Sequence, residues 1–161
     1  MTQLAARPLR DQRVMITGAT GFLGFHLCRR LRKEGADVYA ISRGARESVD
    51  ERFRWLQSDL SDASEIRRML LEVKPDLIFH LSGLVTGVCG LELVLPTLHS
   101  LLVSTVNLLT AAAEIGSTRV VLAGSLTEPM PDDTEPKHGS TYAAAKWPRS
   151  AYGRMFCRLY G

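Results

Sequence analysis

The sequence predicts a three-layer α/β domain with a doubly wound parallel sheet, and three observations support this fold class. Five short, largely apolar runs have the length and β-branching of buried strands, and amphipathic helical patterns lie between most of them. A glycine-rich turn joins the first run to the first helix. An alternating order of strands and helices requires a parallel sheet that helices cover on both faces.

The composition fits one ordinary globular domain. With 161 residues, 45% of them hydrophobic and 23% charged, the chain can bury roughly 68–70% of the surface that it exposes when unfolded. These values argue against a disordered, collagen-like or disulfide-dependent chain. We expect a polar leader over residues 1–12 and a single domain over residues 13–161.

The order of the elements follows from periodicity and capping signals. Strands are expected at residues 14–17, 38–42, 54–57, 76–81 and 119–123. Helices are expected at residues 21–34, after Asp62, and over about 98–115 and 141–160. The spacing of Asp62 and Glu65 is typical of a capping box, which predicts where the second helix begins.

The turn at residues 17–24, Thr-Gly-Ala-Thr-Gly-Phe-Leu-Gly, predicts a dinucleotide site. Gly18 lets the chain turn tightly, Gly21 lets backbone N–H groups approach a pyrophosphate, and Gly24 lets the helix pack close to the strand. The N-terminus of the helix adds partial positive charge. A strand before the motif and an amphipathic helix after it argue against an ordinary turn. We expect the dinucleotide to contact Gly18, Thr20, Gly21, Phe22, Leu23 and Gly24.

Residues that follow the second and third strands bear on which dinucleotide is bound. An acid usually follows the second strand where NAD is bound, whereas this strand ends in Ser42 and Arg43. Because Arg43 can pair with a 2′-phosphate, we expect NADP, with NAD as the alternative; a solvated loop residue is the other interpretation of Arg43. Asp59, followed by Leu60, is expected beside the adenine amine or, alternatively, in a turn before the next helix.

Near the C-terminus, Tyr142 and Lys146 are four residues apart and therefore share one face of the last predicted helix. A neighbouring cation favours the ionised form of a phenol, so that the phenol exchanges its proton more readily. This spacing is common in surface helices, and it acquires a chemical meaning from the glycine turn upstream.

Six segments, taken together in this order, resemble the extended short-chain dehydrogenases/reductases, the NAD(P)-dependent epimerase/dehydratase family that acts mainly on nucleotide sugars. They are residues 17–24, Asp59-Leu60, His80-Leu81-Ser82-Gly83, Asn107-Leu108-Leu109, Gly124-Ser125 and Tyr142-Ala143-Ala144-Ala145-Lys146. The resemblance runs from about Arg13 to Gly161. It implies a Rossmann-like sheet with the strand order 3-2-1-4-5.

The resemblance also implies a role for each matching residue. Ser125 would hydrogen-bond the substrate oxygen that undergoes oxidation, and Tyr142 would move its proton. Lys146 would assist the ionisation of Tyr142 and bind the nicotinamide ribose. The residues that would line the cofactor after the fourth strand are Leu81, Ser82 and Gly83.

The chain departs from the family pattern in several places. Dehydratases of the family have Thr-Asp-Glu where this chain has Ser125-Leu126-Thr127, and Glu128 is one position out of register. An epimerase or ketoreductase-like activity is therefore expected rather than dehydration. Leu101 stands where the family usually has Asn, and residues 129–133 replace the usual Val-Tyr-Gly. The family continues well beyond the last helix, so we expect this domain to lack the C-terminal substrate lobe.

Composition limits the other functional classes. A net charge of +3, with basic residues scattered along the chain, predicts no nucleic-acid partner. Cys28, Cys89 and Cys157 lack the spacing of metal ligands, which predicts no metal and favours a reduced, cytoplasmic chain. The apolar stretch at residues 91–113 contains Glu92 and Pro96, so that no membrane segment is expected.

The sequence therefore predicts an oxidoreductase or epimerase that transfers hydride between NADP, or NAD, and a nucleotide-diphosphate sugar, or the cofactor-binding part of such an enzyme. The alternative is a catalytically silent dinucleotide-binding module, which senses redox state or joins a partner subunit of a larger complex. The family resemblance further implies a homodimer through the helices at 98–115 and 141–160.

Overall fold

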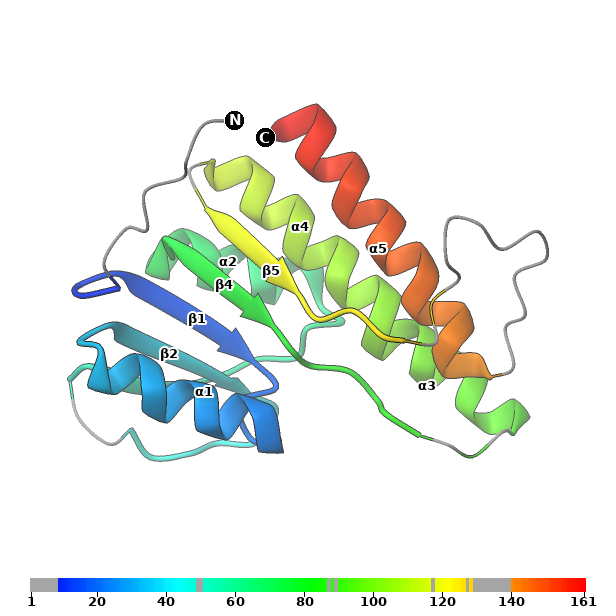
Figure 1. Ribbon diagram of the computed structural model, residues 1–161, viewed down its shortest axis with the longest axis horizontal. Helices are drawn as coiled ribbons and strands as arrows, with labels where there is room; N and C mark the ends of the chain where they lie inside the picture. Colours follow the sequence, from blue (N-terminus) through cyan, green and yellow to red (C-terminus); the bar gives the residue numbers. More distant parts are fainter. Residues whose placement is uncertain are drawn as a thin grey trace.

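The computed structural model describes residues 9–48, 51–86, 88, 90–116, 118–126, 128 and 140–161. Its centre is a parallel five-stranded sheet with the order β3-β2-β1-β4-β5, which confirms the predicted topology (Figure 1). The strands are β1 (Arg13–Thr17), β2 (Asp37–Ser42), β3 (Phe53–Gln57), β4 (Leu77–His80) and β5 (Arg119–Leu122). All five lie within one or two residues of the predicted positions.

Helices cover both faces of the sheet, as predicted for a Rossmann-like fold. Helix α1 (Phe22–Lys33) packs on one face, where Cys28 and Leu31 join the buried side chains of β1 and β2. Helices α2 (Ala63–Val73) and α4 (Ser104–Ile115) pack on the opposite face over Met15 and Ile78. Helix α5 (Thr141–Tyr160) packs against α4 and the segment before it (Figure 1).

The long helical stretch before β5 begins earlier than predicted. Instead of residue 98, it starts with a short 3-10 turn, η1 (Leu91–Leu93), and continues through α3 (Val94–Leu98) and the π-helical segment η2 (His99–Val103) into α4. Pro96 lies in the first turn of α3. An N–H has no partner within the helix at that position, so proline is tolerated there.

Leu91–Ile115 is long and apolar enough to cross a membrane by length and composition, with a mean hydropathy of 1.5 over its most apolar window. The core helix of a soluble protein has the same composition, so this finding carries little weight by itself. In the structure, α4 packs against both α2 and α5.

The start of the domain also differs from the predicted boundary at residue 13. Leu9 packs against the core on the α1 side, and the Asp11 N–H donates to the Gly35 carbonyl at 2.9 Å. The Gln12 carbonyl accepts from the Asp37 N–H at 2.9 Å. Residues 9–12 thus belong to the packed domain, and residues 1–8 of the predicted leader lie outside the described part of the chain.

Side chains cap α2 and α5 at their N-termini. Asp62 accepts from the Ser64 hydroxyl and from the Glu65 and Ser64 N–H groups, and these bonds hold the pKa of its carboxyl below the usual range. The predicted capping box is only half formed, because the Glu65 carboxylate accepts from the Asp59 N–H rather than from Asp62. At α5, the Ser140 hydroxyl accepts from the Ala143 N–H at 3.1 Å, which fixes where the Tyr142 turn begins.

Candidate functional site

The glycine turn between β1 and α1 has the geometry that its sequence predicts. Gly18 has a φ of +70°, and a Cβ at this position would lie 2.8 Å from the Ser82 nitrogen. A Cβ on Gly24 would overlap the Gly18 carbonyl oxygen. These two glycines therefore allow a left-handed turn and a close approach of α1 to β1, respectively.

The N-terminus of α1 opens at this turn. Gly21 is the N-cap residue and has no side chain to satisfy the first N–H groups of the helix. A Cβ on Gly21 would meet only the Gly18 oxygen, at 3.3 Å. Uncapped N–H groups with the partial positive charge of a helix N-terminus form a site suited to a phosphate group.

A cavity of about 650 Å³ lies at the carboxyl ends of β1, β2 and β4, next to this turn. Thirteen of the predicted cofactor residues line it: Gly18, Thr20, Gly21, Phe22, Leu23, Gly24, Ser42, Arg43, Asp59, Leu60, Leu81, Ser82 and Gly83. Pro96, His99, Ser100 and Ser104 close its other side, and Ala123 reaches it from the end of β5. The structure thus brings residues from six separate segments to one cavity.

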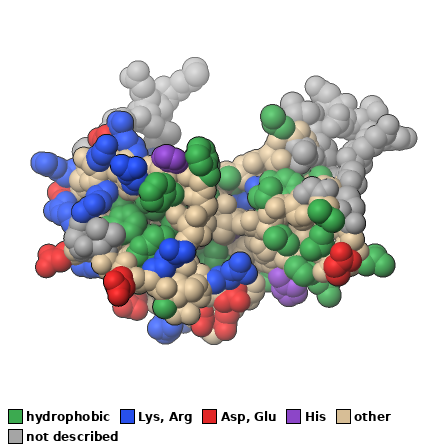
Figure 2. All heavy atoms as spheres, turned by 90° about the horizontal axis from the view of Figure 1, so that it is seen from below, with side chains coloured by type: hydrophobic (Ala, Val, Ile, Leu, Met, Phe, Trp, Pro, Cys, Tyr) green, Lys and Arg blue, Asp and Glu red, His purple; other side chains and the backbone are tan. Residues whose placement is uncertain are grey.

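Where Arg43 and Asp59 line this cavity, the structure keeps the alternatives that the sequence left open. The Asp59 carboxylate accepts from the Ser61 N–H at 2.9 Å, so the turn interpretation of Asp59 is present in the structure. The Arg43 side chain is exposed, and its backbone carbonyl accepts from the Gln57 amide at 3.0 Å. Figure 2 shows further Lys and Arg side chains at the α1 end of the molecule, where the helix carries Arg30, Arg32 and Lys33.

Behind the glycine turn, His80 is the centre of a buried hydrogen-bond network. The Thr105 hydroxyl donates to the Leu101 carbonyl at 2.7 Å, so it can only accept from His80 Nε2, at 2.9 Å. His80 Nδ1 then accepts from the Thr17 hydroxyl at 2.7 Å. Burial, followed by the charges of Arg149 and Lys146, lowers the pKa of His80 well below its usual value, so the imidazole is neutral.

Tyr142 and Lys146 lie together on α5 and are not among the residues that line this cavity; Lys146 is connected to it through Ala123, which does line it. The Lys146 ammonium is 5.7 Å from the centre of the Tyr142 ring, and it donates to the Ala123 carbonyl at 2.6 Å. Only 4% of Lys146 is exposed. Burial, together with the charge of Arg149, lowers the pKa of Lys146 to about 8, and the charge of Glu128 opposes that shift.

Ser125 follows two residues after Ala123, and Glu128 holds its backbone in place. The Ser125 N–H donates to Glu128 Oε1 at 2.8 Å, and the Ser150 hydroxyl donates to Glu128 Oε2. The segment after β5 is therefore attached to α5 at two points, through Lys146 and through Ser150. Thr127 lies outside the described residues, so its place in the segment compared with the dehydratase motif is not described. Residues 129–133 also lie outside the described residues.

Sequence reasoning missed Arg149 and dismissed Glu128. Arg149 is 1% exposed and donates through Nη2 to the His80 carbonyl at 2.8 Å. Arg149 lies seven residues after Tyr142 and therefore on the same helix face, and this spacing is the sequence pattern that could have identified it. Glu128 attracted notice only as a misplaced dehydration acid, because contacts from a loop to a distant helix leave no periodic pattern.

The cysteines and the histidines outside β4 contribute no visible metal site. Within the described residues, no group of three or more His, Cys, Asp or Glu side chains is placed to hold a metal ion. Burial raises the pKa of the Cys28 thiol to about 11, and Cys157 is exposed. Cys89 lies outside the described part of the chain.

Comparison with known proteins agrees with this geometry. The model of the NAD dependent epimerase/dehydratase family matches residues 14–156. A UDP-glucose 4-epimerase of Mycolicibacterium smegmatis is 30% identical over 92% of this chain and 52% of its own length. A CDP-paratose 2-epimerase of Salmonella typhi is 24% identical over 80% of this chain and 41% of its own length.

Solved structures share the fold as well. The UDP-glucose 4-epimerase of Thermus thermophilus, in complex with NAD, superposes with a TM-score of 0.76 at 25% identity, over 92% of this chain and 52% of that one. Uronate dehydrogenase from Agrobacterium tumefaciens superposes with a TM-score of 0.77 at 24% identity, over 94% of this chain and 57% of that one. The chain thus spans about half the length of these relatives, and it belongs to the NAD dependent epimerase/dehydratase family.

Proposed function

We propose that this chain binds NADP, with NAD as the alternative, and that it forms the cofactor half of an enzyme that epimerises or reduces a nucleotide-diphosphate sugar. The observation that carries the proposal is the single cavity lined by the glycine turn and by the ends of β2, β3 and β4. Crevices at the carboxyl ends of parallel strands are where dinucleotides bind in such sheets. Family membership supports the same chemistry.

The residues present fit a dinucleotide. A side chain at Gly18 or Gly24 would collide with backbone atoms, and the N-terminus of α1 presents uncapped N–H groups beside the cavity. Gly18, Gly21 and the first turn of α1 would hold the diphosphate, and Leu81 to Gly83 would line the cofactor further along. When bound, the nicotinamide supplies the hydride acceptor or donor.

The chain's own residues would handle the proton. Ser125 would hydrogen-bond the substrate oxygen, and Tyr142 would take the proton from that oxygen or return it. Lys146, held against the Ala123 carbonyl and beside the Tyr142 ring, would favour the ionised phenol and hold the ribose. Burial of Lys146 strengthens its electrostatic effect on the phenol, because water screens it less.

An epimerase or reductase activity fits this site better than dehydration. Dehydration of a sugar after its oxidation needs an acid and a base beside Ser125. Glu128 is the acidic residue nearest in sequence, and both of its carboxylate oxygens accept hydrogen bonds from within the domain. The names of the relatives include epimerases and a reductase, and also a CDP-glucose 4,6-dehydratase, so the choice depends on the residues around Ser125 and not on these names.

Substitution of Tyr142 by Phe tests the assigned chemistry. Loss of the phenol should lower hydride transfer by about 10²–10⁴-fold, as expected for removal of an acid–base group. The dinucleotide affinity should change little, because the ring and Lys146 remain. Cofactor reduction can be followed by absorbance with UDP-, CDP- and dTDP-sugars, and affinity can be measured by calorimetry.

Tyr152→Phe is the matched control, because Tyr152 lies on the same helix and is 40% exposed. This variant should keep the activity of the unchanged chain. Full activity of the Tyr142→Phe variant would refute the role of Tyr142, whereas failure of the unchanged chain to bind any dinucleotide would refute the proposed function itself.

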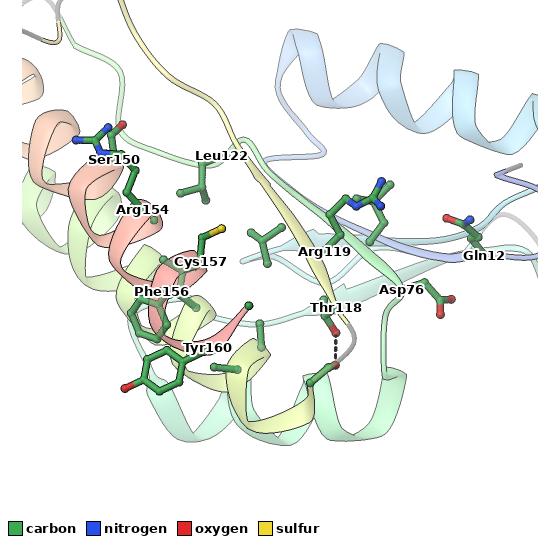
Figure 3. A pocket seen from close by; sticks show the side chains of 18 of the residues that line it. Gln12, Asp76, Thr118, Arg119, Leu122, Ser150, Arg154, Phe156, Cys157 and Tyr160 are labelled. Atoms are coloured by element: carbon green, nitrogen blue, oxygen red, sulfur yellow. Dashed lines mark hydrogen bonds between the residues drawn. The ribbon is translucent and has the colours of Figure 1, made fainter. Parts of the chain in front are cut away.

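A second candidate function is a dinucleotide-binding module that is completed by another polypeptide segment. A groove of about 940 Å³ runs between β5 and α5, and β5 is the edge strand of the sheet (Figure 3). Leu122 of β5 and Phe156 of α5 line it, and Val121 is 39% exposed. Within the described residues, this strand edge lies beside a groove of mixed polar and apolar lining, and such an edge is suited to an added β-strand.

The two candidates give different results with the chain alone. The second predicts stoichiometric dinucleotide binding without turnover of any nucleotide sugar. Turnover should then appear when the second half of a relative, such as the M. smegmatis epimerase, is co-expressed with this chain. Turnover by the chain alone would eliminate the second candidate.

A further inference from the structure

Helix α5 carries two buried cations next to each other, and this pair calls for a nearby negative charge. Lys146 and Arg149 are 4% and 1% exposed. They lie three residues apart, so their charged ends face the same side of the helix. Two like charges in a poorly solvated site repel each other, and each raises the cost of keeping the other protonated.

The hydrogen bonds of Arg149 compensate only part of its charge. Nη2 donates to the His80 carbonyl, while Nε and Nη1 have no hydrogen-bond partner among the described residues. A buried guanidinium usually bonds through several of its five donors. The stabilisation of this cation therefore depends more on charge than on direct contacts.

Glu128 provides the negative charge. Its Oε1 accepts from the Ser125 N–H at 2.8 Å and its Oε2 accepts from the Ser150 hydroxyl. Both bonds fix the carboxylate between the segment after β5 and the helix turn that carries Arg149. Burial lowers the pKa of both cations; the charge of Glu128 opposes this shift at Lys146, and at Arg149 Tyr142 opposes it first and Glu128 second.

Other titratable groups around Lys146 do not replace Glu128. Tyr142 is on the same helix, and His80, on β4, is neutral. The helices that pack on α5 carry His99, which is exposed, and Glu114, which is exposed and paired with Arg67 at 2.6 Å.

We propose that Glu128 is a positioning residue of this site: its carboxylate ties the Ser125 segment to α5 and supplies the negative charge that keeps Lys146 protonated beside the buried Arg149. The inference rests on the proposed function for its meaning, because a protonated Lys146 is what assists Tyr142. Glu128 acts through Lys146 and Ser125, and it is not assigned any contact with the substrate.

Burial and the neighbouring Arg149 lower the pKa of Lys146 to about 8, which makes the charge on Lys146 sensitive to its surroundings near neutral pH. Removal of a negative neighbour should therefore deprotonate Lys146 within the working range of most enzymes. A merely structural role for Glu128 would leave this titration unchanged.

The substitution Glu128→Gln separates charge from contact. A glutamine side chain has the same shape, its oxygen can accept from the Ser125 N–H, and its amide can donate to the Ser150 hydroxyl. Lys146 can be titrated directly by NMR of 13C-labelled lysine, because the chain contains only four lysines, and Lys146→Met identifies its signal. No substrate or dinucleotide is needed for this measurement.

The Glu128→Gln variant should lower the titration midpoint of Lys146 by about one pH unit, the size of shift that one nearby charge produces. Arg149→Met should move the midpoint in the opposite direction, because it removes a like charge. Ser150→Ala, which removes one bond to the carboxylate but no charge, should shift the midpoint less than Glu128→Gln does, and the exposed control Glu72→Gln should keep the wild-type midpoint.

An unchanged midpoint in Glu128→Gln would overturn the proposal, and so would equal shifts in Glu128→Gln and Ser150→Ala. If Arg149→Met does not fold, the comparison of Glu128→Gln with Ser150→Ala still decides. Calorimetric titration of the same variants with NADP tests the proposed function separately, so that each hypothesis can fail while the other stands.

Discussion

At the residue scale, His80 connects the glycine turn to the rest of the fold. Its ring bonds Thr17 of β1 and Thr105 of α4, and its carbonyl accepts from Arg149 of α5. Three elements around the cavity thus meet at one buried side chain. The neutral imidazole satisfies this network, whereas a protonated ring would need a second acceptor.

This burial predicts a dependence of stability on pH. The folded protein holds His80 neutral, while the unfolded chain binds a proton near the usual pKa of 6.5. The free energy of unfolding should therefore fall as the pH decreases through about 6.5. Urea denaturation between pH 7.5 and 5 should show this loss of stability. The loss should be smaller in the His80→Gln variant, and an equal loss in that variant would contradict the prediction.

Arg43, the proposed ligand of a 2′-phosphate, gives a second test at the residue scale. Arg43→Asp removes the expected partner of a 2′-phosphate and places a negative charge there. We expect the affinity for NADP to fall on the order of tenfold or more, with a smaller loss for NAD. Arg46→Asp, in the same exposed loop, is the control. Equal losses for both dinucleotides would show that Arg43 is not a 2′-phosphate ligand.

At the element scale, α5 serves several surfaces at once. Lys146 of its N-terminal half lies beside Tyr142 and donates to Ala123, which lines the cavity, and Phe156 of its C-terminal half lines the groove beside β5. Tyr152, Met155 and Leu159 form an exposed apolar stripe at helical spacing, 40%, 39% and 64% exposed. Further exposed apolar side chains, Val94 and Leu95, lie on α3, which packs against α5.

The exposed stripe supports the homodimer expected from the family resemblance. The chain should elute as a dimer in size-exclusion chromatography with light scattering, and Met155→Asp should shift it toward monomer, because a charge cannot be buried there unpaired. Leu71→Asp on α2, 41% exposed, is the matched control and should leave the mass unchanged. A monomeric mass for the unchanged chain would rule the dimer out.

At the scale of the whole molecule, the two cavities give a test of where a dinucleotide binds. A ligand that binds only the folded chain stabilises it by about 2.7 kcal/mol at one hundred times its Kd. NADP at that concentration should raise Tm, and Gly18→Val should lose the effect because its side chain would enter the Ser82 backbone.

Arg154→Ala, in the groove beside β5, should retain the increase in Tm. The opposite pattern, with the shift lost in Arg154→Ala and kept in Gly18→Val, would place the dinucleotide in the larger groove and contradict the proposed site.

The sequence by itself determined the alternation of strands and helices, the glycine turn and the pairing of Tyr142 with Lys146, whereas the sheet order came from the family resemblance. These features are local: a strand, a turn and a helix follow each other within a few residues, and side chains four apart on a helix must share a face. The resemblance to a family extended this to the residues at the ends of β2, β3 and β4.

Only the tertiary structure decided which charges surround Lys146. Arg149 reaches the carbonyl of a residue 69 positions away, Ser150 bonds a carboxylate 22 positions away, and Thr17 bonds His80 across 63 residues. No periodicity encodes such contacts, because they form only when β4, β5 and α5 pack together. Burial then gives them their effect, since the same charges on the surface would be screened by water.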